Sequence, residues 1–571
     1  MKFGSIGRIR LISFFVLAVA AVLVVRLYYI QVIHADHFAE RADRQYVRPN
    51  QNLFDRGSIF FKDKNGRLIA AATLKTGFTV TIDPTKITDP EGLYTKLSAI
   101  IPLEQDDFLL HASKANDPYE EIAKRVSEEA AKKIEALNTP GLVVYKERWR
   151  FYPGNTLAAQ AIGFVGYDES GTKLDGRYGL ERFYEGTLKR DTSNLYVNFF
   201  AQVFTNLGKT ISGDYRESGD IVTTIEPSVQ LFLEQKFEEV QEKWSSARSG
   251  GIIIDPKTGA IFALSVHPTF NSNDFKQEEN VGVFGNQLVE SVYEMGSIMK
   301  PLTMAAGLDA GVVTATTTYN DHGTLTLNGK TIANFDGKGR GTVPMQEVLN
   351  QSLNTGAAFV ESRLGNARFA KYIKAYGLGE ETGVDLPNEV HGLINNLSSP
   401  RDIEYATASF GQGIAVTPIA MVRALATLGN GGVLVTPHLV ESVHYQAGFS
   451  KTLSYHDGTQ VLKPETSEEI TRMLVEVVDK ALVGGSVKLP HYSVAAKTGT
   501  AQIADNEEGG YYTDRYLHSF FGYAPAYNPR FLIFLFTIEP KGVSFASQTL
   551  VNPFMDTIKF LINYYDIPPD R

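Results

Sequence analysis

A serine and a lysine three positions apart carry the clearest chemical signal in this chain. Ser297 and Lys300 begin an apolar stretch that continues to Leu308. The stretch predicts a buried helix, on which residues i and i+3 share a face. A hydroxyl beside an amine suits serine acyl transfer, with Ser297 as the nucleophile and Lys300 as its base.

Two further motifs follow in the chain, Ser352-Leu353-Asn354 and Lys497-Thr498-Gly499-Thr500. Ser-x-x-Lys alone is expected by chance roughly once or twice in a chain of this length. Ser and Asn also serve as ordinary helix and loop caps. A Lys-Thr-Gly followed by Ser or Thr is rarer, and the ordered set has a joint chance of well under roughly 1%. The three motifs together therefore indicate one site.

Lys300 can act as a base only when its ammonium has lost a proton. This requires burial and a nearby positive charge to lower its pKa from about 10.4, and Lys497 can supply that charge. The competing interpretation of Lys300 is an ordinary surface lysine on a helix. No histidine lies in a recognisable catalytic motif, so a Ser-His-Asp triad is disfavoured.

Composition excludes several classes of protein. The formal charge of −9 and the isoelectric point near 5.8 disfavour a nucleic-acid surface. The chain has no cysteine, which rules out disulfides, thiolate metal ligands and a cysteine nucleophile. The histidines show no metal-ligand spacing, and we expect no metal and no cofactor. A length of 571 residues predicts three to four domains, or fewer if one is large.

The N-terminus predicts a membrane anchor. Residues 11–33 are mostly apolar and long enough to cross about 30 Å of hydrocarbon. Lys2, Arg8 and Arg10 precede this segment, so residues 1–10 are expected to be a cytoplasmic tail and the bulk of the chain to be extracytoplasmic. Arg26 is expected to reach the outer interface or a partner helix. The alternative is a signal peptide cleaved after Ala18-Val19-Ala20.

Two large parts follow the anchor. Residues 34–218 read as a non-catalytic pedestal that mixes strand-like runs such as 76–82 with charged helical segments such as 120–137. Residues 219–571 read as the catalytic domain. Its expected elements are a helix at 227–244, a hairpin at 251–264, helices and loops over 297–473, strands at 492–501, 518–523 and 530–538, and a helix at 554–564.

This order of elements predicts an α+β fold. An antiparallel sheet flanked by helices, with an all-helical subdomain between its halves, brings Ser297, Ser352 and Lys497 into one cleft. Lys497–Thr500 is expected on an edge strand, where Gly499 lets another backbone approach and pair as an added strand.

The chain resembles class B penicillin-binding proteins, the membrane-anchored D,D-transpeptidases that cross-link peptidoglycan, and among them the FtsI-like division enzymes. Ser-x-x-Lys, Ser-x-Asn and Lys-Thr-Gly are their signature, although Leu353 stands where one common version has Asp. The resemblance covers nearly the whole chain. It also rests on Arg56-Gly57, Asn65-Gly66, Gly179-Leu180-Glu181, Thr224-Ile225-Glu226, Asp255–Gly259, Ser409–Gly413, Thr417-Pro418, Asn430-Gly431-Gly432 and Phe521–Pro525.

The resemblance implies a role for each motif residue. Ser352 relays a proton between the two lysines and the leaving D-alanine, and Asn354 binds the amide on the acyl side of the substrate. Thr498 and Thr500 hold the terminal carboxylate of the substrate. The backbone N–H groups of Ser297 and Thr500 form the oxyanion hole.

The resemblance also implies substrates, partners and a location. The substrates are peptidoglycan stem peptides ending in D-Ala-D-Ala, and β-lactam antibiotics acylate Ser297 as mimics of them. The pedestal is dimerisation-like. The implied partners are an FtsW-like glycosyltransferase of the SEDS type and other division proteins, and the implied location is the bacterial inner membrane.

Two departures from the family pattern concern the subfamily rather than the chemistry. Met295 replaces the usual Pro before Gly296, and the segment from Arg56-Gly57 to Asn65-Gly66 is about two residues longer than expected. Three alternatives stay open: an elongation-specific transpeptidase, a D,D-carboxypeptidase or β-lactamase, and a non-enzymatic β-lactam receptor. Glu389–Leu393 does not match the Glu-x-x-Leu-Asn segment of class A β-lactamases, so hydrolysis of an acyl-enzyme is expected to be slow.

Overall fold

The computed structural model describes residues 54–190 and 218–571, together with Phe14 and Val22. Within these ranges, 115–116, 169–170, 172, 447, 456–457, 506 and 508 are not described. The described residues form two compact units. One consists mainly of Leu74–Trp149, and the other of Arg56–Thr73, Arg150–Lys189 and Glu217–Arg571. Each unit has a core of its own.

The Leu74–Trp149 unit packs helices against a small antiparallel sheet. The C-terminal end of β2 (Leu68–Ile82), from Phe78 onward, pairs with β3 (Glu120–Val126), and β4 (Leu142–Phe151) also pairs with β2. The helices are α3 (Pro90–Ser98), α4 (Gln105–Ala112) and α5 (Glu128–Glu135), with the 3-10 turn η2 (Pro84–Lys86) after β2. Apolar side chains of the strands and of α3 and α4 form the core, among them Val80, Leu97 and Phe108.

The prediction of a helix at 120–137 is correct for its second half and wrong for its first. Only Glu128–Glu135 is helical, whereas Glu120–Val126 is the strand β3. Ser127 separates the two elements, because its hydroxyl accepts a hydrogen bond from the Ala130 N–H and caps α5. Pairing of β3 with β2 outweighs the helix propensity of its charged residues.

The second unit includes two stretches of the predicted pedestal. β1 (Ile59–Lys62) pairs in parallel with β7 (Gly219–Thr223) and antiparallel with the first residues of β2. β15 (Val440–Tyr445) and β16 (Ser450–Thr452) extend this sheet beyond β7. The other elements of the two stretches are β5 (Val165–Tyr167), β6 (Leu174–Gly176), α6 (Ala159–Ile162), α7 (Gly179–Phe183) and α8 (Glu185–Leu188). Residue 218 was the predicted boundary between pedestal and catalytic domain. Because β1 pairs with β7 across this boundary, the compact units are discontinuous in sequence.

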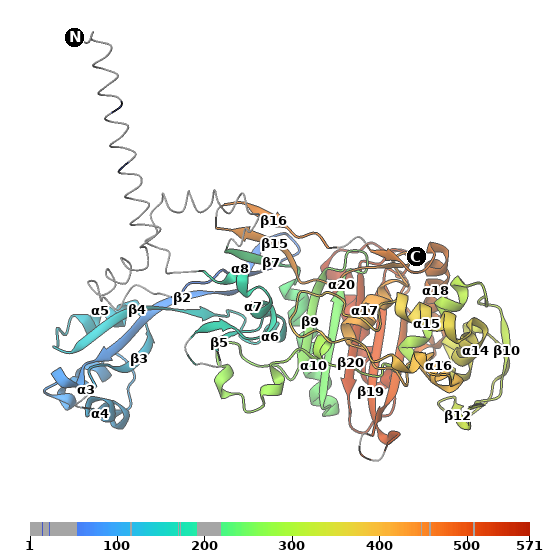
Figure 1. The fold of residues 1–571 in the computed structure, drawn as a ribbon, viewed down its shortest axis with the longest axis horizontal. Helices are drawn as coiled ribbons and strands as arrows, with labels where there is room; N and C mark the ends of the chain where they lie inside the picture. The colour runs from blue at the N-terminus through green and yellow to red at the C-terminus, as the bar shows by residue number, and fades with distance from the viewer. Residues whose placement is uncertain are drawn as a thin grey trace, which may run out of the picture. The chain divides into compact units, whose positions relative to one another are not determined.

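A five-stranded antiparallel sheet organises the rest of this unit. Its order is β18-β19-β20-β8-β9, with β18 at one edge. Figure 1 labels β9, β19 and β20 of this sheet. The strands are β18 (Ala495–Ala504), β19 (Tyr511–Ala524), β20 (Phe531–Ile538), β8 (Arg248–Ile254) and β9 (Ile261–His267). Each was predicted from its apolar run, with ends displaced by a few residues. β19 is the main exception, since it begins seven residues before the predicted strand at 518–523.

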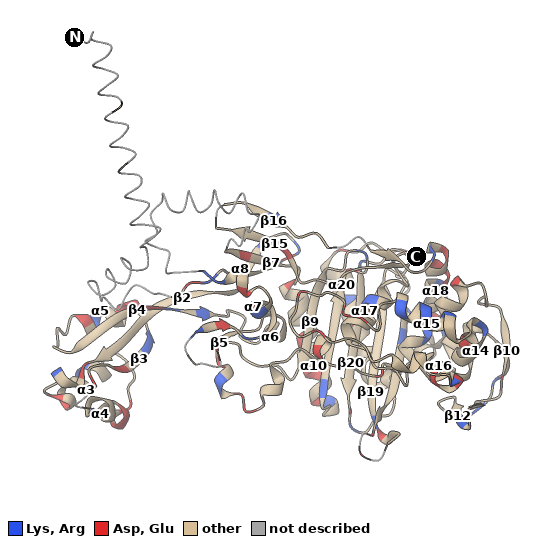
Figure 2. Cartoon of the chain, in the orientation of Figure 1, with Lys and Arg blue, Asp and Glu red and all other residues tan. Residues whose placement is uncertain are grey.

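Helices cover both faces of this sheet, as Figure 1 shows. On one face lie α10 (Pro227–Trp244) and α20 (Val551–Tyr564), which pack on alternate residues such as Phe520 and Ile533. On the other lie α12 (Lys300–Asp309), α17 (Pro418–Ala426) and α18 (Pro464–Glu476), which pack with Phe521 and Phe534. Burial on both faces explains why β20 is apolar at nearly every position. In Figure 2, charged residues mark α10 but leave most of β19 and β20 uncoloured.

The predicted all-helical subdomain is not entirely helical. Its helices are α13 (Met345–Asn350), α14 (Asn354–Leu364), α15 (Asn366–Ala375) and α16 (Asp402–Ala408). Two strand pairs precede them: β10 (Thr318–Asp321) with β13 (Gly341–Pro344), and β11 (Thr324–Leu327) with β12 (Lys330–Ala333). Asn328 and Gly329, both at positive φ, turn the second hairpin. An Asn-Gly pair is a strong hairpin signal, and the sequence interpretation missed it.

Short elements complete the unit. They are α11 (Gln287–Glu290), α19 (Ala546–Thr549), β14 (Val433–Leu434), β17 (Thr459–Gln460), the π-helical turn η8 (Val477–Ala481) and the 3-10 turns η4 (Phe275–Gln277), η5 (Val281–Val283), η6 (Gly296–Met299), η7 (Asn395–Ser398) and η9 (Leu482–Gly485).

The predicted membrane span at 11–33 lies outside the described residues, apart from Phe14 and Val22. Among the residues that the structure does describe, no helix has both the length and the apolar character required to cross a bilayer.

Candidate active site

Ser297 lies in a tight turn that leads into a buried helix. Gly296–Met299 forms the 3-10 turn η6, and α12 continues from Lys300. In 3-10 geometry the side chains at i and i+3 eclipse, which aligns Ser297 with Lys300. Gly296 has a φ of 64°, and a Cβ there would lie 2.7 Å from the Thr500 carbonyl oxygen. Only glycine therefore lets this turn, Gly296–Met299, approach β18 so closely. We call it the nucleophile turn, after the role proposed for Ser297.

The amine of Lys300 lies among three oxygen atoms. Its Nζ is 3.0 Å from Ser297 Oγ, 3.1 Å from Ser352 Oγ and 2.6 Å from the Ser352 carbonyl oxygen. The side chain is 1% exposed, and the surface-lysine alternative does not hold. The structure therefore brings the proposed nucleophile and base into hydrogen-bonding contact.

Ser352 connects the two lysines. It lies in the short link between α13 and α14, where its backbone adopts a φ of 54°. Lys497 Nζ, from β18, lies 3.0 Å from Ser352 Oγ and 3.1 Å from the Thr498 carbonyl oxygen. One hydroxyl thus contacts both amines, which provides a path for a proton between them.

Burial shifts the pKa of both lysines. Within the described chain, neither has an acidic partner. Burial, and then repulsion by Lys497, lower the pKa of Lys300 well below 10.5. Burial alone lowers the pKa of Lys497 to about 8. Because Lys300 also experiences the charge of its neighbour, Lys300 is the better candidate for the neutral amine and Lys497 for the ammonium.

The Lys497–Thr500 motif lies on the edge strand β18, where it was predicted. The backbone that approaches Gly499 is, however, the chain's own nucleophile turn. A Cβ on Gly499 would contact Ser519 Oγ and lie 2.8 Å from the Met295 carbonyl oxygen. Gly499 is therefore needed to seat the Ser297 turn against β18. Thr498 and Thr500 are both partly exposed on this strand.

Asn354 begins α14 and is held by the neighbouring hairpin. Its Nδ2 donates a hydrogen bond of 2.8 Å to the Ala333 carbonyl oxygen at the end of β12. Next to it, Thr355 donates to the buried carboxylate of Asp321, which also accepts from Asn334. These contacts fix the start of α14 and thereby the position of the Asn354 amide.

The sequence interpretation missed two groups that position the site. Ser519 on β19 donates a 2.8 Å hydrogen bond to the Met295 carbonyl oxygen, which anchors the nucleophile turn. Asp321 organises the hairpin beside Asn354. Neither belongs to a motif. Ser519 becomes recognisable only through its register partner Gly499.

The segment Glu389–Leu393, which was compared with the Glu-x-x-Leu-Asn segment of class A β-lactamases, does not supply a carboxylate to activate water at Ser297. Glu389 instead accepts hydrogen bonds from the Thr382 N–H, the Thr382 hydroxyl and the Gly383 N–H. Its oxygens are occupied by its own loop. Glu389 therefore does not provide a base for hydrolysis of an ester at Ser297.

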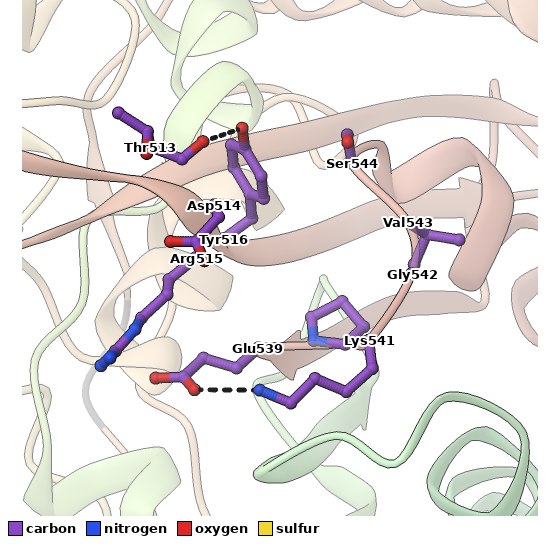
Figure 3. Close-up of a pocket in the computed structure, with 10 residues that line it drawn as sticks. Thr513, Asp514, Arg515, Tyr516, Glu539, Lys541, Gly542, Val543 and Ser544 are labelled. Atoms are coloured by element: carbon purple, nitrogen blue, oxygen red, sulfur yellow. Dashed lines mark hydrogen bonds and ion pairs between the residues drawn. The ribbon is translucent and has the colours of Figure 1, made fainter.

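A separate hollow opens where β19 begins and β20 ends, and Figure 3 shows its lining. Four charged side chains line it, the exposed Asp514, Arg515 and Lys541 and the partly exposed Glu539, and Glu539 pairs with Lys541 at 3.5 Å. None of the motif residues lines it. Its connection to the site is the chain after Ser544, where the Ala546 N–H donates to Thr500 Oγ1 at 3.2 Å.

Comparison with known families identifies both parts of the chain. Residues 250–558 match the penicillin-binding protein transpeptidase domain, and residues 54–203 match the penicillin-binding protein dimerisation domain.

Similar curated proteins span nearly the whole chain. Stage V sporulation protein D of Bacillus subtilis is 29% identical over 96% of this chain and 84% of its own length. The FtsI homolog of Mesostigma viride, a peptidoglycan D,D-transpeptidase, is 28% identical over 100% of this chain and 97% of its own. The peptidoglycan D,D-transpeptidase MrdA of Acinetobacter baumannii is 27% identical over 96% of this chain and 87% of its own.

Solved structures show the same fold. Penicillin-binding protein 2X of Streptococcus thermophilus aligns with a TM-score of 0.72 at 21% identity, over 90% of this chain and 81% of its own. Penicillin-binding protein 3 of Mycobacterium tuberculosis, complexed with aztreonam, aligns with a TM-score of 0.68 at 22% identity, over 91% of this chain and 98% of its own.

Proposed function

This chain belongs to the penicillin-binding protein transpeptidase family as a class B peptidoglycan D,D-transpeptidase, and we propose that Ser297 is its acylated nucleophile. The observation that carries the assignment is the contact of Lys300 Nζ with Ser297 Oγ at 3.0 Å, in a site where burial lowers the pKa of the lysine. A neutral amine at this distance can accept the hydroxyl proton.

In the first half-reaction, Ser297 Oγ attacks the carbonyl carbon between the two terminal D-alanines of a stem peptide. Lys300 takes the hydroxyl proton, and Ser352 passes a proton to the nitrogen of the leaving D-alanine. The C–N bond breaks, D-alanine departs and an ester remains on Ser297. Lys497 supports the route, because its Nζ contacts the same Ser352 hydroxyl.

In the second half-reaction, the amine of a second stem peptide attacks the ester and forms the cross-link, and Ser297 regains its proton. The backbone N–H groups of Ser297 and Thr500 stabilise the oxyanion in both steps. Asn354 binds the acyl-side amide, and Thr498 and Thr500 bind the terminal carboxylate. The partial exposure of Thr498 and Thr500 on an edge strand supports this placement, since an extended peptide can pair along that edge.

The site assignment is tested by labelling the full-length protein with fluorescent penicillin. We expect one adduct per chain, on the peptide that contains Ser297, and none in Ser297→Ala. The control is Ser486→Ala, which removes an exposed hydroxyl that bonds only to its own turn. Label on Ser352, or persistent labelling of Ser297→Ala, contradicts the assignment. Decay of the adduct within seconds favours a carboxypeptidase or β-lactamase instead.

We also place the enzyme in the cell envelope as a single-pass membrane protein with a cytoplasmic N-terminus. The apolar run at 11–33 and the basic residues before it support this topology. The resemblance to FtsI-like enzymes supports a role in division, alongside an FtsW-like glycosyltransferase and other division proteins. A fluorescent fusion at its native level should concentrate at division sites. Even distribution along the lateral wall favours the elongation alternative.

A further inference from the structure

Glu361 on α14 is a buried carboxylate without a partner. Its side chain is 3% exposed, and Oε1 has no hydrogen-bond donor. Within the described chain, no hydrogen bond or ion pair reaches either carboxylate oxygen. Burial, and then the charge of Asp402, raise the pKa of Glu361 to about 7. Since an unpaired buried carboxylate is costly, its presence needs an explanation.

A cavity of about 380 Å³ borders this carboxylate. Two stacked rings, Tyr319 and Phe359, line it with their centroids 5.3 Å apart. Asp402 adds a second carboxylate, whose Oδ1 accepts a hydrogen bond from Asn366. The lining contains no lysine or arginine. The cavity therefore combines two carboxylates with aromatic surface, and His322 is the one basic side chain in its lining.

We propose that this Glu361 cavity binds a small organic molecule through a primary ammonium group, with Glu361 as the counter-ion and the rings of Tyr319 and Phe359 packed against its carbon chain. Carboxylates with aromatic rings are the usual surroundings of bound organic cations. A divalent metal fits less well, because no group of three metal-ligating side chains occurs in the described part of the chain.

The cavity is distinct from the catalytic cleft but shares a helix with it. Thr355, which lines the cavity, directly follows Asn354, and Glu361 lies two turns further along α14. None of the motif residues that contact Ser297 lines the cavity. Both carboxylates project from helices, Glu361 from α14 and Asp402 from α16, which are rigid supports for a binding site.

Calorimetric titration of the full-length protein with butylamine tests the proposal directly, with 1-butanol as the neutral ligand of similar shape. At pH 8, butylammonium should bind one per chain, and butanol at least tenfold more weakly. Glu361→Gln should weaken butylammonium binding at least tenfold. The matched control is Glu468→Gln, which removes an exposed carboxylate from α18 and should leave the affinity unchanged.

Acidification to pH 6 should weaken binding to the native protein, because a proton then competes for Glu361. The other titratable side chains that face the cavity are Asp402, His322 and Tyr319. Protonation of His322 or Asp402 would also weaken butylammonium binding. The loss of affinity between pH 8 and pH 6 is therefore compared in the native protein and in Glu361→Gln, and the difference is the contribution of Glu361. A native-like thermal unfolding transition verifies that each variant is folded.

Three results with the two organic ligands overturn the proposal. They are equal affinity of butylammonium for the native protein and Glu361→Gln, absence of binding at millimolar ligand, and equal binding of butanol and butylammonium. A stabilisation by K⁺ or Na⁺ alone that depends on Glu361, with no butylammonium binding, also overturns it and assigns an inorganic cation instead. All of these readouts are independent of whether Ser297 is the catalytic nucleophile.

Discussion

The chemistry of the site depends on two lysines that share one hydroxyl. Lys300 and Lys497 both lie within 3.1 Å of Ser352 Oγ, and neither has a carboxylate partner in the described chain. Two ammonium groups at such short range repel each other strongly in a buried site. The pair therefore favours one neutral amine and one charged amine, which supplies a base and an acid from the same residue type.

This arrangement predicts a bell-shaped pH dependence of acylation. The rate should rise as Lys300 loses its proton through its lowered pKa, and fall as Lys497, with a pKa of about 8, loses its own. The measurement is the second-order rate constant of penicillin acylation between pH 5 and 10.

Lys497→Arg tests which residue causes the alkaline limb. A guanidinium stays charged throughout this range, so the limb should move beyond about pH 10, although the overall rate falls because the geometry changes. An alkaline limb that stays near pH 8 in this variant contradicts the assignment to Lys497.

At the level of elements, the site is made by the packing of the nucleophile turn against an edge strand. Gly296 and Gly499 remove the two Cβ atoms that would separate them, and Ser519 holds the Met295 carbonyl oxygen. The turn and β18 come from segments about 200 residues apart. Their spacing therefore depends on the whole sheet rather than on either segment.

Gly499→Ala should slow acylation by at least about 100-fold, because the new methyl group displaces the Ser297 turn from β18. Overpacking should also cost about 1–3 kcal/mol of stability. Penicillin labelling rates and calorimetry measure the two effects. In the control Gly186→Ala, no atom lies within 4 Å of the added Cβ, and stability should change by less than about 0.5 kcal/mol. An unchanged labelling rate in Gly499→Ala shows that the close approach is not required.

Much of the fold was predictable because its elements carry strong local signals. The helix Pro227–Trp244 has the predicted bounds, since proline and a capping Glu226 mark its start. The apolar runs of β8 and β20 reflect burial on two faces. The three motifs proposed to be catalytic were recognisable because the chemistry expected of them restricts the residue types and the spacing.

Other features could not be predicted from local sequence. Strand β3 depends on its partner β2, which lies 38 to 48 residues earlier in the chain, and its own charged residues favour a helix. Ser519 and Asp321 act through contacts that only register and packing create. The positions of the motif residues within one cleft likewise required the topology of the sheet.

At the level of the whole molecule, a buried ion network joins two segments of the larger unit, Arg56–Thr73 and Arg150–Lys189. Glu181, which is 0% exposed, accepts from Arg56 Nε at 2.6 Å and from Arg150 Nε at 2.5 Å. Tyr152 also donates to it at 3.2 Å. Burial alone raises the pKa of Glu181, but the charges of Arg150 and Arg56 outweigh burial and lower it below 4.5.

Glu181→Gln should lower the free energy of unfolding by about 3–5 kcal/mol at neutral pH, because it leaves the buried Arg150 without its carboxylate partner and Arg56 with only the partly exposed Glu185. Since the pKa of Glu181 is lower in the folded state, its contribution is present above pH 4.5 and is lost as the pH falls through the folded value. Calorimetry at pH 7 and pH 4 should therefore show a smaller difference at the lower pH.

The control for this prediction is Glu239→Gln. It breaks an ion pair with Lys236 in which the glutamate side chain is 61% exposed. An exposed pair contributes about 0–1 kcal/mol, so this variant should resemble the native protein. Equal destabilisation by the two substitutions shows that the network around Glu181 contributes no more to the free energy of unfolding than an exposed ion pair does.

The backbone conformation of Ser352 lowers the stability of the protein, whereas its hydroxyl is expected to be needed for acylation. A serine at a φ of 54° costs about 1–2 kcal/mol that a glycine does not. Ser352→Gly should therefore melt at a higher temperature while acylating far more slowly, since the hydroxyl between the lysines is gone. Calorimetry and penicillin labelling of the same sample separate the two effects. Selection of this enzyme for thermal stability alone therefore favours loss of the proposed proton relay at Ser352. Screens for stable variants should also measure activity.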